Sequence, residues 1–448
     1  MANQKSLDKL QKIIQDTSNQ IINQTDQTRN QKFTNYFVGA NLEFADLSMS
    51  DLDDVNLSET ILRGAYLICA NLKRTNFSNS DLSHANLSGA IMWFANFSKV
   101  NFQGGDLRGA NLKGANLEGA NLEGANLGRS DITDAQLIQA NFTSANLTRA
   151  NLRNSNLTNV NLSYAKLDDA NFNEANLTGT NFSHANLRNI TLKNANLKNS
   201  NLSNVNLVGS HLNKANLEGA NLEGANLEGS NLTDTNLNNT KLRNANLNYV
   251  NFRGVKINDE TELDDKWYLV WDIVNHGAYG RYLSGINLKH ADLKGANIGT
   301  ANLTNANLEY ANLRYANLSS ANLTNIELNH ANLTDINLIK ANLYNADMRG
   351  VNLSNTLLFN SIMTGALLNQ ATLLNAQLCS AELSNAKLVM ANMMNANLKN
   401  ARLLGADLRK TNLEGAELDG TIFGNNMGVS EEMKQKLIKR GAIFQDKY

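Results

Sequence analysis

The residues of this chain that could bind a metal ion or act as a nucleophile are six histidines, two cysteines and many serines and threonines. Cys69 and Cys379 lie far apart in the sequence, so they cannot form a disulfide framework. His211 and His276 have no potential ligand beside them. The other four histidines occupy one outward position of a five-residue pattern: His84, His184, His290 and His330. No serine or threonine has a predictable histidine and acidic partner. We therefore expect no catalytic residue, no metal site and no cofactor.

The overall composition argues against several other classes of function. The patterns GxGxxG, GxxxxGK and GxSxG do not occur. Forty basic and 41 acidic residues leave a formal net charge of −1, so bulk electrostatics does not favour binding to nucleic acid or to an anionic membrane. The first residues contain no hydrophobic signal segment, and no stretch approaches the length of a membrane span. We expect a cytoplasmic protein that binds neither nucleic acid nor membrane.

A large apolar residue recurs at every fifth position from Leu42 to Ile257 and again from Leu288 to Phe423. On a helix this spacing would carry the apolar side chains around the cylinder instead of forming a stripe. In an unbroken strand an odd period would send successive apolar residues to opposite faces. The chain must therefore bend once in every five-residue unit.

The other positions of the unit predict how it packs. The residue two positions before each large apolar residue is nearly always small, so one large and one small side chain can point inward and fill a narrow tube. The residue between them is mostly Asn or Asp, which favours turns and can form stacked ladders. The remaining two positions are predicted to face solvent. Four units close a square coil of 20 residues, and the 44 and 28 units would give about 11 and 7 coils.

The repeated run Ala-Asn-Leu-Glu-Gly, as at 115–119 and 215–219, resembles the pentapeptide-repeat family with its consensus A(D/N)LXX. The resemblance covers about four fifths of the chain and implies an all-β solenoid, a right-handed quadrilateral β-helix. The run from Lys266 to Gly277 is similar to inserts of cyanobacterial members.

Three segments depart from the repeat and are predicted to hold short helices. Apolar residues in the first 32 positions recur at helical spacing, which favours an amphipathic helix. A second set lies at helical spacing in the central segment, between a capping Asp264 and a terminating Gly277: Leu263, Trp267, Val270, Trp271 and Val274. Near the end, Ser430 is a predicted helix N-cap, and 442–444 is a predicted final strand. We predict a cap at 1–32, a first β-helix at 33–257, an insertion at 258–285, a second β-helix at 286–425 and a capping helix and tail at 426–448.

Apolar residues at outward positions are the candidate protein contacts. In the second β-helix they include Ile339, Tyr344, Leu357, Phe359, Ile362, Val389 and Met390, and in the first coils they include Ile68, Trp93 and Phe94. In a square coil Ile339, Leu357 and Phe359 share one face, and Tyr344 and Ile362 lie around the next corner. These residues either contact a protein partner or a second copy of the chain, or are covered by the terminal segments.

The sequence is consistent with two functions. The first is a non-enzymatic protein-interaction scaffold, including a regulatory binding protein or a homodimer. The second is a DNA mimic that binds DNA gyrase, as the resemblance to quinolone-resistance and gyrase-inhibitor members suggests. Full imitation of duplex DNA over a rod roughly 80 Å long would need about 47 negative charges. The net charge of −1 therefore disfavours the second function.

Overall fold

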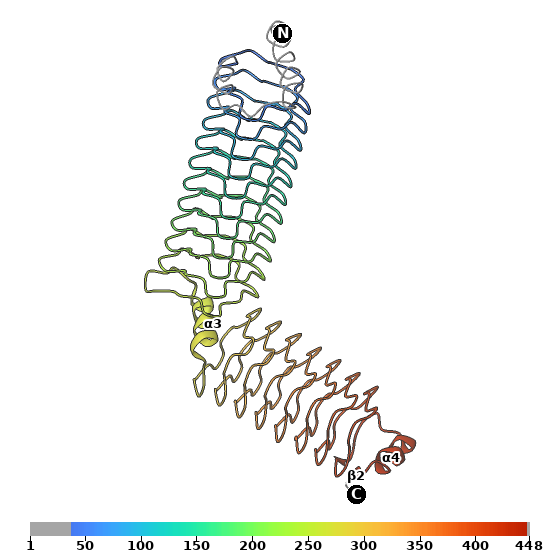
Figure 1. Cartoon of the computed structure of the whole chain (residues 1–448). Coiled ribbons are helices and arrows are strands. Elements are labelled where there is room, and N and C mark those ends of the chain that lie inside the picture. The colour runs from blue at the N-terminus through green and yellow to red at the C-terminus, as the bar shows by residue number, and fades with distance from the viewer. Residues whose placement is uncertain (1–36, 446–448) are drawn as a thin grey trace, which may run out of the picture. The chain divides into compact units, whose positions relative to one another are not determined.

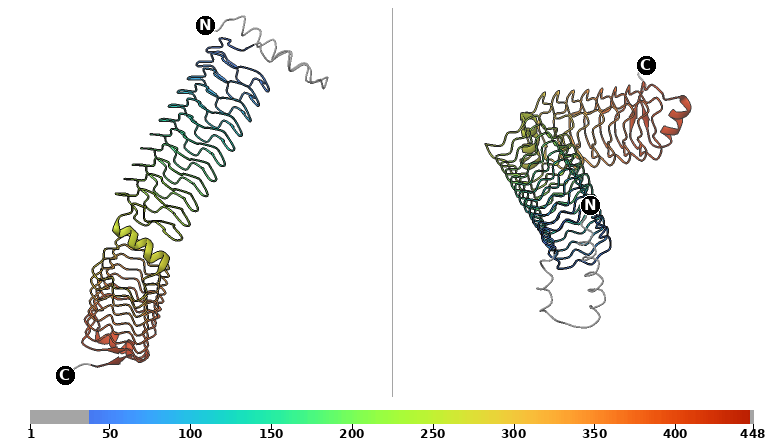
Figure 2. Two further views of the ribbon diagram at one scale, coloured as in Figure 1. Left: turned by 90° about the vertical axis from the view of Figure 1, so that its left-hand side faces the viewer. Right: turned by 90° about the horizontal axis from the view of Figure 1, so that it is seen from above.

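The computed structural model describes residues 37–445, which form two compact units (Figure 1). Unit 1 contains the described residues up to Leu247 together with Gly254–Asp264. Unit 2 contains Asn248–Arg253 and the described residues from Asp265 onward. Each unit is a stack of similar coils, which Figure 2 shows from two further directions. The predicted N-terminal helix at 1–32 lies outside the described residues.

One coil contains 20 residues, because the parallel bridges that join neighbouring coils pair each residue with the residue 20 positions later. In unit 1 these bridges begin with Asn41 and Ile61, and in unit 2 they end with Asp407 and Met427. Four five-residue units therefore complete one turn of the chain. The last bridge of unit 1 joins Lys241 to Glu262, one residue beyond the regular spacing. Ile257 is also half-buried, so the inward pattern of unit 1 ends before it.

Every unit contains one tight turn, as the five-residue period predicts. From Gly39 to Gly254 and from Gly280 to Asn425, every fifth residue has a positive φ, between 52° and 70°. The Ala45 N–H donates to the Leu42 carbonyl at 3.0 Å across such a turn. A four-residue turn with positive φ at its third residue has type II geometry, which favours Gly and Asn there. Gly and Asn are frequent at this position for a conformational reason, not only because it faces solvent.

The large and small residues of each unit both point inward. Leu152 is fully buried and Ala150 is 1% exposed, whereas Glu123 at an outward position is exposed. Larger side chains also fit this core: the rings of Phe77 and Phe97 stack with centroids 5.2 Å apart in neighbouring coils. The predicted inward assignment is confirmed by this burial.

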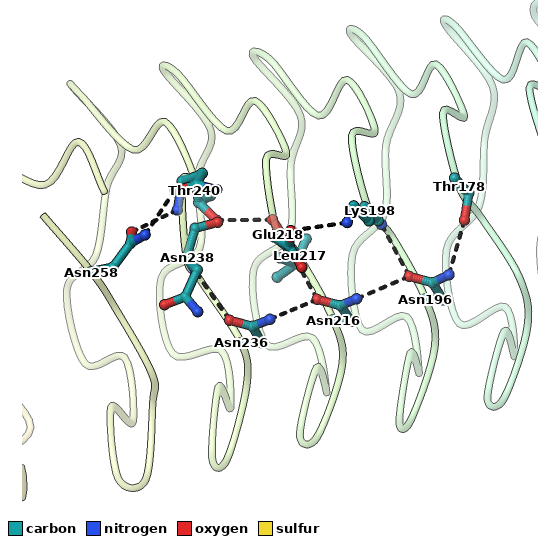
Figure 3. Close-up of polar contacts among 11 residues, drawn as sticks. Thr178, Asn196, Lys198, Asn216, Leu217, Glu218, Asn236, Asn238, Thr240 and Asn258 are labelled. Carbon is teal, nitrogen blue, oxygen red and sulfur yellow. Dashed lines mark hydrogen bonds and ion pairs between the residues drawn. The ribbon is translucent and has the colours of Figure 1, made fainter. Parts of the chain in front are cut away.

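Asparagines between the inward residues form ladders along the coils (Figure 3). The Asn216 Nδ2 donates to Asn196 Oδ1 at 3.2 Å, and the Asn236 Nδ2 donates to Asn216 Oδ1 at 3.0 Å. The Asn216 Oδ1 also accepts the Glu218 backbone N–H at 3.2 Å, which fixes the turn of its own unit. One asparagine thus stabilises both the local bend and the stacking of coils.

Several units of unit 1 have a serine at the small inward position. The buried serines at this position donate a hydrogen bond to a main-chain carbonyl, and Ser230 is the exception. The Ser210 Oγ donates to the Leu187 carbonyl at 2.8 Å. Ser230 lies in the next coil at the same position, is equally buried, and its Oγ has no partner. A buried polar group without a hydrogen bond costs roughly 1–3 kcal/mol, whereas a typical hydrogen bond contributes about 1 kcal/mol.

We therefore expect opposite effects from two alanine substitutions in one column. Ser230→Ala removes an unpaired hydroxyl and should leave the free energy of unfolding unchanged or raise it by up to about 1 kcal/mol. Ser210→Ala removes a bonded hydroxyl and should lower it by about 1 kcal/mol. Denaturant unfolding of the two variants and the wild type measures the difference. Equal losses in both variants would contradict the assignment.

Helix α3, Asp265–His276, lies in the segment predicted to interrupt the repeat. Its buried residues are Trp267, Val270 and Ile273. Trp271 and Val274, which we placed on the apolar side, are only half-buried. Gly277 ends the helix with φ +77°, and its N–H donates to the Ile273 carbonyl at 3.0 Å. The helix is held to unit 2 by side chains that bond carbonyls of the coils, namely Lys266 Nζ to Lys289 at 2.8 Å and Asn275 Nδ2 to Phe252 at 3.0 Å.

The last coil of unit 2 is covered by helix α4, Glu431–Ile438, and by a short parallel sheet of β1, Ile422–Phe423, with β2, Ile443–Phe444 (Figure 1). The Ser430 Oγ, at the predicted N-cap, accepts the Met433 N–H at 3.2 Å. The Arg440 guanidinium donates to the Leu413 carbonyl at 3.0 Å and to the Ala416 carbonyl. These contacts satisfy backbone groups that a terminal coil would otherwise leave open.

Candidate protein-contact surface

Each coil of unit 2 has four faces of five residues, and residues 20 positions apart lie on one face in neighbouring coils. We name the faces by one coil: 341–345 on face A, 346–350 on B, 351–355 on C and 356–360 on D. Face A follows face D across a corner, and the corner between B and C lies diagonally opposite. Outward apolar residues can form one surface only if they lie on the same face or on two faces that meet at a corner.

Four of the predicted contact residues lie at or beside the corner between faces D and A, and we call them the corner patch: Ile339, Leu357, Phe359 and Ile362. Tyr344 lies at the other end of face A, in the turn that leads to face B. The bridges from Asn337 to Leu357 and from Asn342 to Ile362 place the coils of the patch side by side. Tyr344, Leu357 and Ile362 are 46%, 37% and 44% exposed, and Ile339 and Phe359 are half-buried. The C-terminal residues up to 445 therefore do not cover this patch.

Val389 and Met390 do not belong to the corner patch. Both lie on face B, and Met390 occupies the positive-φ turn position at the corner with face C. That corner is diagonally opposite the corner patch, so one flat partner cannot contact both groups. The sequence pattern names Val389 and Met390 as candidates, and the register of the coils separates them from the corner patch.

The three candidates in unit 1 lie on two faces of neighbouring coils. Ile68 is half-buried on one face, and Trp93 and Phe94 lie on the next face, one coil later. The Lys73 Nζ lies 5.0 Å from the centre of the Trp93 ring, an attractive cation–π contact. The Phe94 ring lies across Gly114, where a Cβ atom would be 2.5 Å from the ring. Both aromatic rings thus have intramolecular partners.

Charged side chains are unevenly distributed around unit 2. In the four coils from residue 286 to residue 365, faces D and A carry one charged residue, Lys340. In the same four coils, faces B and C carry nine: Lys289, Asp292, Lys294, Glu309, Arg314, Glu327, Asp335, Asp347 and Arg349. The corner patch therefore lies in an almost uncharged half of the surface.

Ion pairs account for many of the charges on faces B and C. Lys289 pairs with Glu309 at 2.6 Å, and Arg314 pairs with Asp335 at 3.2 Å. The hydrogen bond from Lys289 holds the pKa of Glu309 below its ordinary value. These faces are a solvated mixed surface, and exposed pairs of this kind add little to stability.

The histidines of unit 2 contact neighbouring aromatic rings. His290, Tyr310 and His330 stack along one corner with centroids 5.2 Å and 5.1 Å apart, and the Tyr249 hydroxyl lies 2.8 Å from His290 Nδ1. Sequence reasoning missed this stack, although the spacing of 20 residues between the rings is its signal. Within residues 37–445, no three His, Cys, Asp or Glu side chains lie close enough to hold a metal ion. No helix of the described chain could span a membrane.

Comparison with known families gives extensive matches. A profile described as "Pentapeptide repeats (8 copies)" matches residues 36–68, 57–93, 65–104, 95–134, 191–229, 220–259, 282–317, 316–355, 361–400 and 395–425. A second, described as "Pentapeptide repeat region", matches residues 125–202. No curated protein sequence matches the chain significantly.

Several solved structures are also similar. HetL, a pentapeptide repeat protein involved in heterocyst differentiation regulation from the cyanobacterium Nostoc sp. strain PCC 7120, is 30% identical. That match covers 53% of this chain and 97% of HetL, with a TM-score of 0.29. Rfr23 from the cyanobacterium Cyanothece 51142 is 38% identical over 22% of this chain and 64% of its own, with a TM-score of 0.19. A trypsin-treated QnrB1, a plasmid-mediated fluoroquinolone resistance protein, is 19% identical over 50% of this chain and 87% of its own, with a TM-score of 0.21.

Proposed function

Because the chain belongs to the pentapeptide-repeat family, whose fold is a right-handed quadrilateral β-helix, we propose that it is a non-enzymatic protein-interaction rod. Proteins of this family are generally non-catalytic. The observation that carries the proposal is the corner patch, where Leu357 and Ile362 are exposed and Lys340 is the only charged residue nearby on faces D and A. Exposed apolar residues that gather on one polar rod are typical of a protein contact.

The architecture supports binding through side chains on a rigid surface. The Leu357 N–H donates to the Ile336 carbonyl at 3.0 Å, and the Leu358 N–H donates to the Gln377 carbonyl at 2.8 Å. The backbone at the patch is therefore occupied by the neighbouring coils and cannot pair with a partner strand. An aromatic anchor such as Phe359 and the aliphatic side chains around it can supply the binding energy, since full burial of one such residue contributes roughly 1.5–3 kcal/mol.

A DNA-mimicking function is supported less well. The acidic side chains of the first coils share their face with cations: Arg74 pairs with Asp53 at 2.8 Å and with Asp54 at 2.7 Å. Further along that face Arg153 pairs with Glu174 at 2.9 Å. A mimic of duplex DNA needs a face of uncompensated negative charge. The free thiols Cys69 and Cys379 suit the reducing cytoplasm that we propose as the site of action.

Affinity capture from the native cytoplasm tests the proposal. We expect the wild-type chain to retain a discrete protein, which includes a second copy of the chain itself. Phe359→Lys should lose that protein, because a charge at the centre of an apolar contact is costly to bury. Met390→Lys, on the opposite corner, is the matched control and should retain it. Gyrase captured equally by all three chains would favour the alternative, and no captured protein at all would contradict the proposal.

A further inference from the structure

One face of unit 1 carries exposed aromatic rings between two lysines. Lys73, Trp93 and Lys113 occupy the same outward position in three consecutive coils, which parallel bridges join. Trp93 is 40% exposed, and Phe94 beside it is 64% exposed. Ile91, at the start of the same face, is 36% exposed. We call these residues the Trp93 patch: Lys73, Ile91, Trp93, Phe94 and Lys113.

The two lysines place positive charge on both sides of the rings. The Lys73 Nζ lies 5.0 Å from the centre of the Trp93 ring, and Lys73 makes no ion pair with any residue in 37–445. The Lys113 Nζ lies 4.0 Å from Asp134, and both side chains are about half exposed, so this pair is weak. Arg74 adds little, because two aspartates of the preceding coil hold it at 2.8 Å and 2.7 Å. The patch can therefore bind carboxylates.

The spacing of the lysines restricts the shape of a partner. Coils lie about 4.8 Å apart, so Lys73 and Lys113 are roughly 10 Å apart along the rod, with Trp93 midway. On an α-helix, residues i and i+7 lie on one side about 10.5 Å apart, with i+3 and i+4 between them. In an extended segment, residues on one side recur about every 6.8 Å, which does not match.

From these observations we infer that the Trp93 patch binds an acidic amphipathic helix of another protein, lying along the axis of unit 1. The helix carries acidic residues at i and i+7 and a large apolar residue at i+3 or i+4. The carboxylates pair with Lys73 and Lys113, and the apolar side chain packs against Trp93 and Phe94. The inference goes beyond the proposed function, since this surface lies on unit 1 and does not depend on the corner patch.

Two other occupants fit less well. Single-stranded nucleic acid also uses cations and stacked aromatic rings, but its phosphates continue along the strand, and acidic residues lie two coils from Trp93 in both directions on this face. Helix α3 has acidic residues at the required spacing, Asp265 and Asp272. However, Arg281 holds Asp272 at 2.6 Å and His276 holds it at 2.8 Å. A second copy of α3 therefore cannot offer the free pair of carboxylates.

Binding of designed helical peptides to the full chain tests the inference. The first peptide has glutamates at i and i+7 and leucines at i+3 and i+4. In the second peptide the later glutamate is moved to i+5, and in the third both glutamates are glutamines. Fluorescence anisotropy of the labelled peptides, over about 1 to 500 µM protein at low salt, measures the affinities. The wild type should bind the first peptide about fivefold or more tightly than the other two.

Variants of the chain locate the contact. Trp93→Ser should weaken binding of the first peptide about tenfold or more. The double variant Lys73→Gln and Lys113→Gln should bind the glutamate and glutamine peptides equally, because the lysines are the groups that distinguish them. Lys193→Gln is the matched control, since Lys193 is exposed in the same outward column but lies between coils with asparagine there, and it should behave as the wild type.

Several results would overturn the inference. These are no binding of any peptide, equal affinity for all three peptides, or equal losses in Lys193→Gln and in the double lysine variant. Binding of oligo-deoxythymidine that depends on Trp93 and is tighter than binding of the first peptide would assign the patch to nucleic acid. None of these results affects capture of a protein through Phe359, so failure here is distinguishable from failure of the proposed function.

Discussion

Replacement of Leu152 with aspartate is expected to unfold the coils on both sides of the substitution. Leu152 is fully buried and lies in line with Ile132 and Phe172, the inward residues of the neighbouring coils. The change removes roughly 1.5–3 kcal/mol of apolar burial and adds an unpaired buried charge that costs several kcal/mol more. In a solenoid each coil contacts only its neighbours, so the damage should be local.

Hydrogen exchange measured by mass spectrometry distinguishes this from a global loss of structure. Protection should fall around 132–172 and be retained in unit 2. Glu123→Ser changes an exposed outward residue and is the matched control, with an expected change in unfolding free energy within about 0.5 kcal/mol. Similar losses of protection in the two variants would refute the inward and outward assignment.

The second large effect is expected from Gly428→Ala at the C-terminal cap. Gly428 has φ +86°, and a Cβ atom there would lie 2.6 Å from the backbone N and Cα of Arg409. Left-handed backbone costs a residue with a side chain about 1–2 kcal/mol, and overpacking adds roughly 1–3 kcal/mol because backbone cannot move aside as a flexible side chain can. We expect a loss of about 2–5 kcal/mol, felt first in α4 and β2.

Gly124→Ala separates the two contributions. Gly124 also has a positive φ, +64°, but a Cβ atom there has no neighbour within 4 Å. Its replacement should cost only the conformational part, about 1–2 kcal/mol. Thermal unfolding and the exchange rates of amides in 431–444 provide the measurements. If Gly428→Ala and Gly124→Ala lower stability equally, the close approach of Gly428 to the Arg409 backbone makes no contribution of its own.

The sequence predicts much of this fold because one short rule repeats along most of the chain. A large residue and a small residue two positions apart share one face of a strand, but the odd period of five keeps every such pair inside only if the chain bends once per unit. Four bends close a coil. The same rule predicts that Leu357 and Phe359 share a face and that Ile362 lies around the corner. Once the inward positions are known, every outward residue has an assigned face, so the corner patch follows from spacing alone.

Other features depend on contacts that spacing does not specify. The Tyr310 and His330 rings stack because side-chain rotamers align across coils, and the pattern defines only their positions. Ser230 lacks the bond that Ser210 makes, although both occupy the same column. In α3 the buried side includes Ile273. Lys266 and Asn275 bond carbonyls of the coils and so fix which side of the helix faces them, and helical spacing alone does not predict these bonds. These are tertiary contacts between chemically ordinary residues.

The aligned side-chain amides of the asparagine ladders give unit 1 a net dipole along its axis. In every rung the side-chain N–H group points to the preceding coil and the carbonyl oxygen points to the following one, as from Asn216 to Asn196. The amide dipoles therefore add, as peptide dipoles do along a helix. An anion, Asp81, begins one ladder by accepting from Asn101 at 3.1 Å, and a cation, Lys256, follows the last asparagine of another, Asn236. Rods of this kind would meet unlike poles when stacked head to tail and like poles when stacked head to head.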